Sequence, residues 1–459
     1  MFDFNIDAHK YNHVFFIGIG GISMSALAEL LLAYDYQVSG SDPKPSPITE
    51  RLSNHGATIY SNHDPNHLKD VDLVIYTDAI SLDNPELKEA IKKKLDIVDR
   101  ASFLGALMKN YDISIAISGT HGKTSTTSMV TEIIKNAPEN PTILLGGQLD
   151  DIDGNIKIGD NHLFLTEACE YKANILKYFP TTATILNIDE DHLDYFDNID
   201  HIVSTFRQYM ENLGTHDHVI LNVDDENVLK LLPIENALAH TFSIEGKADY
   251  QAKNLIFSQE GLPQYDLYYQ GEKIDTVHLQ VLGRHNIYNS LAAIASVHVN
   301  GFEFHEIIPE IEKYKGVHRR LEDKGYFKGA RIMDDYAHHP TEIRSTIHAL
   351  KKSCKGKLYC IFQPHTYTRT KILLDSFSKS FNEADITIIT DIYAAREKDY
   401  GDIHSKTLCN AIKECHGNAY YMKTFDDIAL FLKDHLKKDD IAVTMGAGNV
   451  YEIGEILLR

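Results

Sequence analysis

The chain lacks the features of several protein classes. Its five cysteines are scattered, odd in number and form no C-x-x-C pair. The sequence therefore predicts free thiols in a reducing compartment rather than a disulfide framework or a zinc site. No stretch approaches 18 uninterrupted apolar residues, and residues 1–11 lack the apolar core of a signal peptide. We expect a cytoplasmic protein with no membrane insertion.

Positive charge is also scarce. The chain has 45 Lys and Arg against 66 Asp and Glu, which gives a formal net charge of −21. Nucleic-acid phosphates require a basic face, so we expect no nucleic-acid partner. A chain this acidic can bind an anion only locally, with backbone dipoles, a few basic side chains and a bound cation.

Strand-like and helix-like segments alternate through three sections of the chain. Domains average about 150 residues, so a chain of 459 residues is expected to form two to four of them. The strands expected in the outer sections are residues 13–17, 73–77, 331–333, 357–362, 386–390 and 441–444. The helices expected there are residues 23–34, 86–94, 341–351 and 371–381. Such alternation predicts mainly parallel sheets that bind ligands at the carboxyl ends of their strands.

The most informative segment reads S-I-A-I-S-G-T-H-G-K-T-S-T-T over residues 114–127. Gly119 and Gly122 allow a sharp turn whose N–H groups face phosphate oxygens, at the N-terminus of a helix. Lys123 supplies a mobile charge and Thr124 a hydroxyl for Mg²⁺. A strict Walker pattern has another glycine five positions before Gly122. An ordinary strand-to-helix turn is the alternative, but this order of features favours binding of a nucleoside triphosphate.

A second glycine-rich turn, G-I-G-G-I-S, follows the expected strand at residues 13–17. It contains Gly18, Gly20 and Gly21, and Ser23 occupies the position of the third glycine in G-x-G-x-x-G. Asp42 comes roughly 20 residues later, where an acidic residue of a nucleotide-binding fold meets a ribose hydroxyl. The motif alone fits an NAD site as well as another diphosphate site.

Oxygen donors follow two apolar runs downstream of the phosphate loop. Glu167 ends one run, and His192 lies in N-I-D-E-D-H-L-D after the next. Mg²⁺ prefers carboxylates, hydroxyls and substrate phosphates, and histidine is a less typical ligand. Any one of these acids could be a surface carboxylate or a helix cap. Together they favour a magnesium site with Thr124.

Two further clusters are rich in polar side chains. His285 and Asn289 are four residues apart, hence on one helical face, where a helix start with a capping Asn is the simpler account. His338 precedes a His-Pro pair at a strand-to-helix corner, and Arg369 follows the next expected strand. Together they suggest a small polar substrate pocket, although single loop histidines are common.

Taken in order along the chain, these motifs resemble the Mur ligases, ATP-dependent amide-forming enzymes of peptidoglycan precursor synthesis. The matching motifs are G-I-G-G at Gly18, G-T-H-G-K-T at Gly119, E-A-x-E at Glu167, D-H-L-D at Asp191, G-R-H-N at Gly283, R-R at Arg319, D-D-Y-x-H-H-P-T-E at Asp334 and Q-P-H-x-Y-x-R-T at Gln363. The motifs G-I-G-G and D-D-Y-x-H-H-P resemble those of the member that adds L-alanine to UDP-N-acetylmuramate. The related enzyme that recycles murein tripeptide is the alternative.

The resemblance implies an α/β fold of three domains. N- and C-terminal Rossmann-like parallel sheets would flank a central P-loop ATPase-type α/β domain. The expected boundaries are 1–109 for the UDP-sugar domain, 110–316 for the ATP domain and 317–459 for the amino-acid domain. The implied partners are UDP-N-acetylmuramate, L-alanine and ATP, in a monomer or weak homodimer.

The resemblance also implies roles for individual residues. Those expected to contact ATP are Gly119, Thr120, His121, Gly122, Lys123, Thr124, Ser125, His285, Asn289, Arg320 and Asp335. Those expected at the UDP-sugar are Gly18, Gly20, Gly21, Ser23, Ser41 and Asp42. Mg²⁺ would be held by Thr124, Glu167 and His192, and the amino acid by Tyr336, His338 and Arg369. Lys123 and His338 are the expected catalytic residues.

Two departures from the family pattern and two other functions remain open. Cys169 stands where the family usually has aspartate, and Thr366 stands where it usually has arginine. An NAD-dependent oxidoreductase would use the turn at Gly18 but leaves the loop at Gly119 unexplained. A non-catalytic nucleotide sensor would bind ATP without releasing phosphate.

Overall fold

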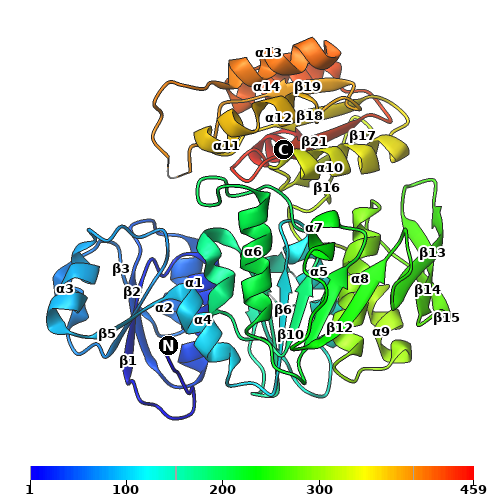
Figure 1. Ribbon diagram of the computed structural model, residues 1–459. Helices are drawn as coiled ribbons and strands as arrows, with labels where there is room; N and C mark the ends of the chain where they lie inside the picture. The colour runs from blue at the N-terminus through cyan, green and yellow to red at the C-terminus, as the bar shows by residue number, and fades with distance from the viewer. Residues whose placement is uncertain (1, 150–151, 153, 396) are drawn as a thin grey trace. The chain divides into compact units, whose positions relative to one another are not determined.

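The computed structural model describes residues 2–149, 152, 154–395 and 397–459, which form two compact units. The first unit comprises Met1–Ile188, Asp200–Thr241 and Ala292–Ile307. The second comprises Asp189–Ile199, Phe242–Leu291 and Ile308–Arg459. Figure 1 labels the elements of each unit.

The N-terminal part of the first unit is a five-stranded parallel sheet in the order β3-β2-β1-β4-β5. Its strands are β1 His13–Ile17, β2 Gln37–Ser41, β3 Thr58–Tyr60, β4 Leu73–Tyr76 and β5 Asp96–Asp99. Its helices are α1 Ile22–Ala33, α2 Pro47–Asn54, η1 Pro65–Leu68, α3 Pro85–Lys93 and α4 Arg100–Met108. The strand order reverses direction at β1, where open α/β sheets bind ligands.

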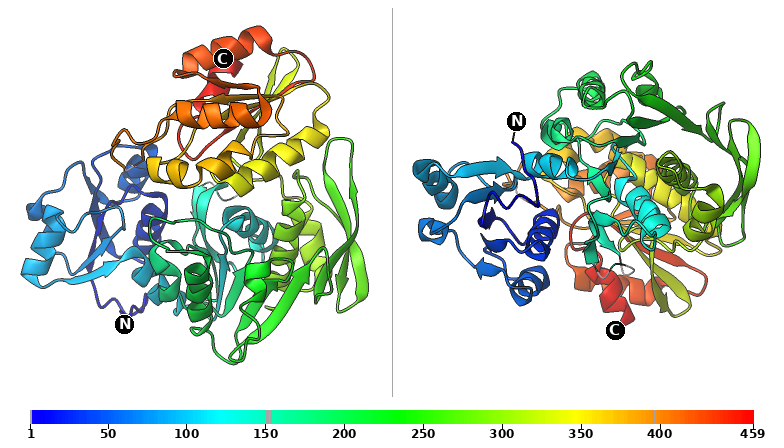
Figure 2. Two further views of the ribbon diagram at one scale, coloured as in Figure 1. Left: turned by 45° about the horizontal axis from the view of Figure 1, so that its top comes forward. Right: turned by 90° about the horizontal axis from the view of Figure 1, so that it is seen from below.

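Local sequence explains how these elements begin and pack. Helix α3 starts where the sequence predicts, because Pro85 suits the first turn and the Asn84 side chain accepts hydrogen bonds from the next two free N–H groups. On one face of the sheet, Phe15, Ile17 and Val74 pack against residues of η1 and α3. Helices lie along this blue sheet in both views of Figure 2.

The first unit also contains the strands that carry the phosphate loop, in the order β11-β10-β6-β9-β7-β8. Their bounds are β6 Ile113–Ser118, β7 Thr142–Leu149, β8 Gly154–Lys157, β9 Leu163–Ala168, β10 Thr182–Ile185 and β11 His218–Asn222. The associated helices are α5 Lys123–Ile134, η3 Tyr171–Lys177, α6 Ile199–Met210 and α7 Glu226–Leu229, and α8 His285–His298 and α9 Phe304–Ile311 follow later in the chain. Every pair of these strands whose register is described is parallel, except the antiparallel pair β7–β8. Ser118 pairs with Ala168 and Ile185, so β6, β9 and β10 end at the same edge.

The second unit contains an antiparallel meander and a six-stranded sheet. The meander consists of β13 Tyr250–Phe257, β14 Pro263–Tyr269 and β15 Glu272–His278, and the end of β12 Leu238–Ser243 pairs with β13. The six-stranded sheet has the order β16-β17-β21-β18-β19-β20, in which only β16 runs antiparallel to its neighbour. Its strands are β16 Glu322–Phe327, β17 Ala330–Asp335, β18 Leu358–Phe362, β19 Ile386–Ile389, β20 Ala419–Tyr421 and β21 Ile441–Met445.

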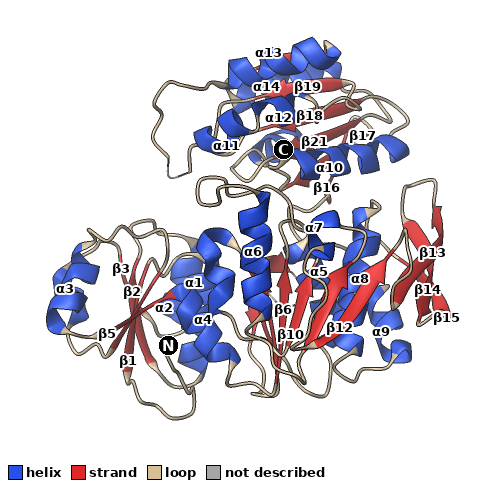
Figure 3. Cartoon of the chain, in the orientation of Figure 1, coloured by secondary structure: helices blue, strands red, loops and turns tan. Residues whose placement is uncertain are grey.

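Helices cover both faces of the six-stranded sheet (Figure 3). They are α10 Pro340–Ser353, α11 Tyr367–Ile372, α12 Leu374–Ser378, α13 Ser405–His416, α14 Phe425–His435 and α15 Glu452–Leu458. Along β18, Leu358, Cys360 and Phe362 pack with α10, α12 and α13, whereas Tyr359 and Ile361 pack with α14 and α15. This alternation follows from the two-residue period of a strand and explains why β18 is apolar throughout.

The predicted three-domain α/β class with parallel sheets is confirmed. The predicted helix over residues 371–381 is wrong, because the structure has two short helices there. Thr366 caps α11 with its hydroxyl at 3.4 Å from the N–H of Arg369, and Leu373 leaves helical geometry before α12 begins. The predicted domain boundaries remain a prediction. Among the described residues, no helix is both long and apolar enough to span a membrane.

Candidate active site

The phosphate loop joins β6 to α5 in the first unit. Gly119 and Gly122 have φ of +130° and +84°, a region that disfavours side chains. A Cβ on Gly119 would also lie 3.0 Å from the carbonyl oxygen of Asn187. Both glycines are therefore required by the shape of the loop, as the sequence predicts.

Asn187, just after β10, fixes this loop from the neighbouring strand. Its side-chain oxygen accepts a hydrogen bond from the N–H of His121 at 2.8 Å, and its amide donates to the His121 carbonyl at 3.0 Å. Its own carbonyl accepts from the N–H of Thr120 at 3.1 Å. Sequence reasoning did not single out Asn187, although it stands directly after an apolar run, as Glu167 does.

Lys123 lies folded back against the loop. Its Nζ donates to the carbonyl oxygens of Gly119 and Thr120, the latter at 2.9 Å, and lies 3.1 Å from the Glu170 carboxylate. Burial lowers the pKa of Lys123, but the nearby negative charges, chiefly Glu170, raise that pKa above its ordinary value overall. The side chain therefore stays an ammonium, held at the N-terminus of α5 where anions are favoured.

Thr124 and Glu167 provide neighbouring oxygen donors beside the loop. The Thr124 hydroxyl donates to Glu167 Oε2 at 3.1 Å, while Glu167 Oε1 accepts from the N–H of Gly146 at 2.8 Å. A Cβ on Gly146 would come within 2.7 Å of this carboxylate, so glycine permits the contact. A hydroxyl and an oriented carboxylate are the donors that Mg²⁺ prefers, and these two residues fit such an ion.

The glycine-rich turn after β1 also belongs to the first unit. Gly18 has φ of +85° and donates its N–H to the carbonyl of Ser41 at 2.8 Å. The N–H of Gly20 donates to the Asp42 carboxylate at 3.0 Å. Gly21 is the N-cap of α1, and the Ser23 hydroxyl accepts from Arg100 at 3.3 Å. The structure thus brings together the ends of β1 and β2, as the sequence predicts.

Ser41 takes part in a buried polar cluster that sequence reasoning missed. Its hydroxyl donates to Glu86, a fully buried carboxylate, at 2.6 Å. His63 and His67 lie 2.8 and 2.9 Å from the same carboxylate. These residues come from separate segments, and no local spacing in the sequence signals that they meet.

In the second unit, the residues predicted near the nucleotide lie around the end of β17. Asp335 accepts hydrogen bonds from the N–H groups of Ala337 and Leu321 at 2.7 and 2.8 Å, and burial raises its pKa to about 6. Arg320 counteracts this rise in pKa by its charge, and its guanidinium lies 4.9 Å from the Tyr336 ring. Burial, helped by Arg320, lowers the pKa of His285 to about 4.

Asn289 lies one helical turn beyond His285 on α8. It is buried, and its amide donates to the side-chain oxygen of Asn286 at 2.9 Å. The Asn289 side chain therefore forms a hydrogen bond within α8 and does not cap the start of this helix. The structure leaves its predicted contact with ATP a prediction.

His338 lies at the corner between β17 and α10, where His339 has extended geometry before Pro340. Burial lowers the pKa of His338 to about 4, although Glu342 opposes this shift. Its Nδ1 lies 3.0 Å from the Tyr336 carbonyl, which can only accept, so Nδ1 carries the proton. At neutral pH the imidazole is uncharged, and Nε2 is its acceptor atom.

Arg369, on α11, forms an ion pair with Asp191, 178 residues earlier in the chain. Its Nη2 lies 2.7 Å and its Nε 3.3 Å from Asp191 Oδ1, and both side chains are nearly buried. Burial raises the pKa of Asp191, but His192 and Arg369 lower it to well below its usual range overall. His192, the third predicted metal ligand, follows in this loop with φ of +55°. Asp191 is a further residue that sequence reasoning did not assign to the site.

Models of known protein families match most of this chain. A family model described as "Mur ligase middle domain" matches residues 117–297. Models described as "Mur ligase family, catalytic domain" and "Mur ligase, glutamate ligase domain" match residues 13–112 and 319–448. The chain belongs to the Mur ligase family.

This Mur ligase is similar to named relatives along its whole length. It is 47% identical over 458 residues to the UDP-N-acetylmuramate–L-alanine ligase of Alkaliphilus metalliredigens, covering 100% of this chain and 99% of the relative. The crystal structure of UDP-N-acetylmuramate-alanine ligase from Thermotoga maritima aligns with a TM-score of 0.81 at 26% identity, covering 97% and 98% of the two chains. A murein peptide ligase from Psychrobacter arcticus aligns with a TM-score of 0.73 at 25% identity over the same shares.

Proposed function

We propose that this Mur ligase joins L-alanine to the lactyl carboxylate of UDP-N-acetylmuramate in peptidoglycan precursor synthesis. ATP is its co-substrate, and ADP and phosphate are the products. The observation that carries this proposal is the full-length similarity to relatives named for this reaction. The phosphate loop at the shared edge of β6, β9 and β10 supports it independently.

The first step requires two anions to approach each other, because the sugar carboxylate attacks the γ-phosphate of ATP. The ammonium of Lys123, the N–H groups of the loop and the N-terminus of α5 would offset this repulsion and stabilise the transferring phosphoryl group. The product is an acyl phosphate, with ADP as the leaving group. Mg²⁺, when bound, would neutralise further phosphate charge. We propose that Thr124, Glu167 and His192 hold it.

In the second step a neutral amine attacks the acyl carbon and expels phosphate. Because His338 is uncharged at neutral pH and protonated on Nδ1, its Nε2 would accept a hydrogen bond from the amine of L-alanine, position it and take up the proton that the nitrogen loses as the amide forms. We propose that Arg369 binds the carboxylate of the amino acid and that Tyr336 lines the same pocket. Water must be excluded at this stage, because an acyl phosphate hydrolyses readily.

The remaining predicted contacts complete the substrate assignment. We propose that the turn at Gly18, Gly20 and Gly21, with Ser23, Ser41 and Asp42, holds the UDP part of the sugar. The ATP tail would lie on Gly119–Ser125. His285, Asn289, Arg320 and Asp335 would contact the nucleoside. The five cysteines, which form no disulfide, and the use of ATP support a cytoplasmic enzyme, and its predicted state is a monomer or weak homodimer.

A phosphate-release assay tests the reaction directly. With UDP-N-acetylmuramate and ATP, we expect release with L-alanine to exceed release with glycine or L-serine, and mass spectrometry to detect the amide product. Release with murein tripeptide alone would instead assign the recycling reaction. ATP binding without release under any condition would indicate a nucleotide sensor. Binding of NADH, followed by its fluorescence, would favour the oxidoreductase.

Glu167→Gln is expected to weaken activation by magnesium by about 10–100-fold, because the variant loses an anionic oxygen donor but keeps its shape. The measurement is phosphate release against Mg²⁺ concentration at saturating substrates. Glu226→Gln, at the start of α7, is a matched control that should keep the wild-type magnesium curve. An unchanged magnesium curve in Glu167→Gln would remove Glu167 from the proposed site.

A further inference from the structure

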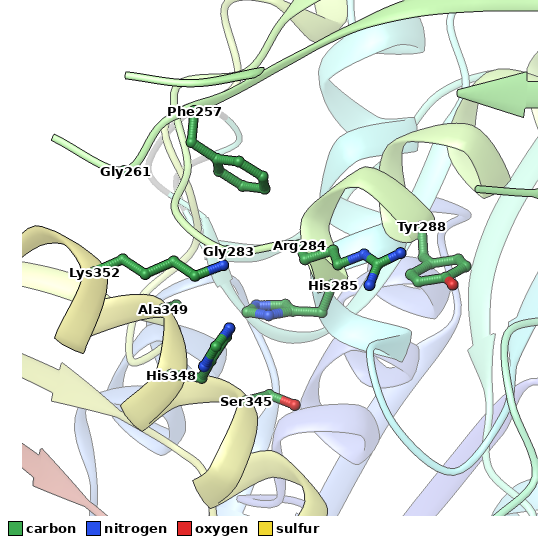
Figure 4. A pocket seen from close by; sticks show the side chains of 10 residues that line it. All are labelled: Phe257, Gly261, Gly283, Arg284, His285, Tyr288, Ser345, His348, Ala349 and Lys352. Carbon is green, nitrogen blue, oxygen red and sulfur yellow. The ribbon is translucent and has the colours of Figure 1, made fainter. Parts of the chain in front are cut away.

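A cavity of about 300 Å³ lies within the second unit, beside the start of α8 and along α10 (Figure 4). Its lining comes from the end of β13 and the turn after it, the start of α8 and one face of α10, and consists of Phe257, Gly261, Gly283, Arg284, His285, Tyr288, Ser345, His348, Ala349 and Lys352. Its volume is at the lower end of the range for small-molecule sites. Of the residues proposed to contact the substrates, the cavity shares only His285.

The charge of this cavity contrasts with that of the chain. None of its lining residues is acidic, although the protein has 66 Asp and Glu. Its basic side chains are Arg284, His348 and Lys352. Glu245 pairs with Arg284, and Glu383 lies 3.1 Å from His348, so both of these side chains have an acidic partner outside the cavity. No carboxylate of the described chain forms an ion pair with Lys352.

Lys352 is associated with an aromatic ring instead. Its Nζ lies 5.0 Å from the centroid of Phe257, within the range of a cation–π contact. Figure 4 shows both side chains directed into the space above His285. Ammonium and ring together form a surface that is apolar along one side and positive at its edge.

A glycine also lines the cavity. Gly283 has φ of +96°, and a Cβ there would lie 2.5 Å from the His285 ring and 3.2 Å from the Ala349 Cβ. The glycine therefore lets backbone, imidazole and helix α10 approach closely. His285 is uncharged at neutral pH, so this part of the lining can contact an apolar ring face.

We propose that this cavity binds a planar aromatic molecule that carries one anionic group, with its ring against Phe257 and its anion beside Lys352. A carboxylate or sulfonate on a one- or two-ring system matches both the volume and the single uncompensated charge. An aromatic ligand can contact Phe257 by an edge or offset arrangement and leave the ring face next to Lys352 to the ammonium. This site does not depend on the proposed ligase reaction.

Calorimetric titration of the full-length protein with 2-naphthoate tests the proposal. We expect saturable binding, weakened at least about tenfold by Lys352→Glu, since the reversal converts attraction into repulsion at short range. Lys355→Glu makes the same charge change at an exposed position outside the cavity, and should alter the Kd by less than about twofold. The neutral 2-naphthalenemethanol should bind at least about tenfold more weakly than the acid. No binding, or equal binding by both variants, would overturn the proposal.

Two further experiments test where the ligand binds. Soaked crystals with 6-bromo-2-naphthoate should show a bromine anomalous peak between Phe257 and α10, and a peak elsewhere would refute the assignment. Binding of 2-naphthoate should persist in the presence of a saturating non-hydrolysable ATP analogue. Competitive displacement by the analogue would mean that the cavity is part of the nucleotide site and would also overturn the proposal.

Discussion

Lys123→Ala is expected to lower turnover by about 10²–10³-fold, the loss typical when a preorganised charge stabiliser is removed. The ammonium is held beside the loop by two loop carbonyls and by Glu170 at 3.1 Å. Negative charge accumulates on the phosphate oxygens in the transition state, and the loop N–H groups alone offset only part of it. The measurement is phosphate release at saturating ATP, UDP-N-acetylmuramate and L-alanine.

A control must distinguish a loss of catalysis from destabilisation by the Glu170 carboxylate, which loses its ammonium partner in Lys123→Ala. Glu170 is 2% exposed, and removing Lys123 leaves its charge without this partner. The double variant Lys123→Met with Glu170→Gln removes both charges and should remain as slow as Lys123→Ala. Lys230→Ala, an exposed position in the same unit, should retain wild-type turnover. Recovery of activity in the double variant would show that Lys123 acts only by neutralising Glu170.

Asp191→Ala is expected to lower the free energy of unfolding by about 3–5 kcal/mol, because it leaves a nearly buried guanidinium without its carboxylate. Arg369 is 12% exposed, and two of its nitrogens contact the same Asp191 oxygen. We also expect turnover to fall, since Arg369 would no longer be fixed beside His338. Urea unfolding of wild type and variant at neutral pH provides the measurement.

The stability difference should depend on pH in a defined direction. The pKa of Asp191 lies below its usual range in the folded protein, so the folded state binds its proton more weakly than the unfolded state. The stabilisation is therefore complete above the unfolded pKa of about 4 and is lost as pH falls below that value. Wild type and Asp191→Ala should differ less at pH 3 than at pH 7.

A double-mutant cycle identifies the partner. Arg369→Met alone leaves Asp191 without its guanidinium partner and should also destabilise, whereas Asp191→Ala with Arg369→Met should lose less than the sum of the single changes. Glu190→Ala, at an exposed position of the same loop, should change stability by less than about 0.5 kcal/mol. Additive losses in the cycle would contradict a direct Asp191–Arg369 interaction.

Local features of this protein could be read from the sequence. The strand, two glycines, lysine and helix of the phosphate loop follow one another within residues 113–134, and each is dictated by neighbouring residues. The same holds for α3, where Asn84 and Pro85 define the start. The predicted start of the helix at residue 371 is wrong, because the capping hydroxyl of Thr366 starts α11 earlier than the apolar pattern suggests.

Contacts between distant segments could not be read in this way. Asp191 and Arg369 are 178 residues apart, and each has ordinary neighbours in the sequence. The Asn187 side chain bonds the backbone of His121, and Gly146 donates its own N–H to Glu167, so in each contact one partner is a backbone group that carries no residue-type signal. Their functions depend on how strands align in the sheet, which only the folded structure specifies.

Helices pack on both faces of β18, so this strand contributes to the stability of the fold, whereas the residues proposed to bind the amino acid lie outside it. All five of its residues, Leu358–Phe362, are enclosed by helices on one face or the other, so the strand tolerates little change. Of the residues proposed to bind the incoming amino acid, Arg369 lies on α11, beyond the end of β18, whereas Tyr336 and His338 lie at the corner after β17. A different amine could therefore be accommodated by changes beyond the ends of these two strands, through divergence or by design, without rebuilding the strands themselves.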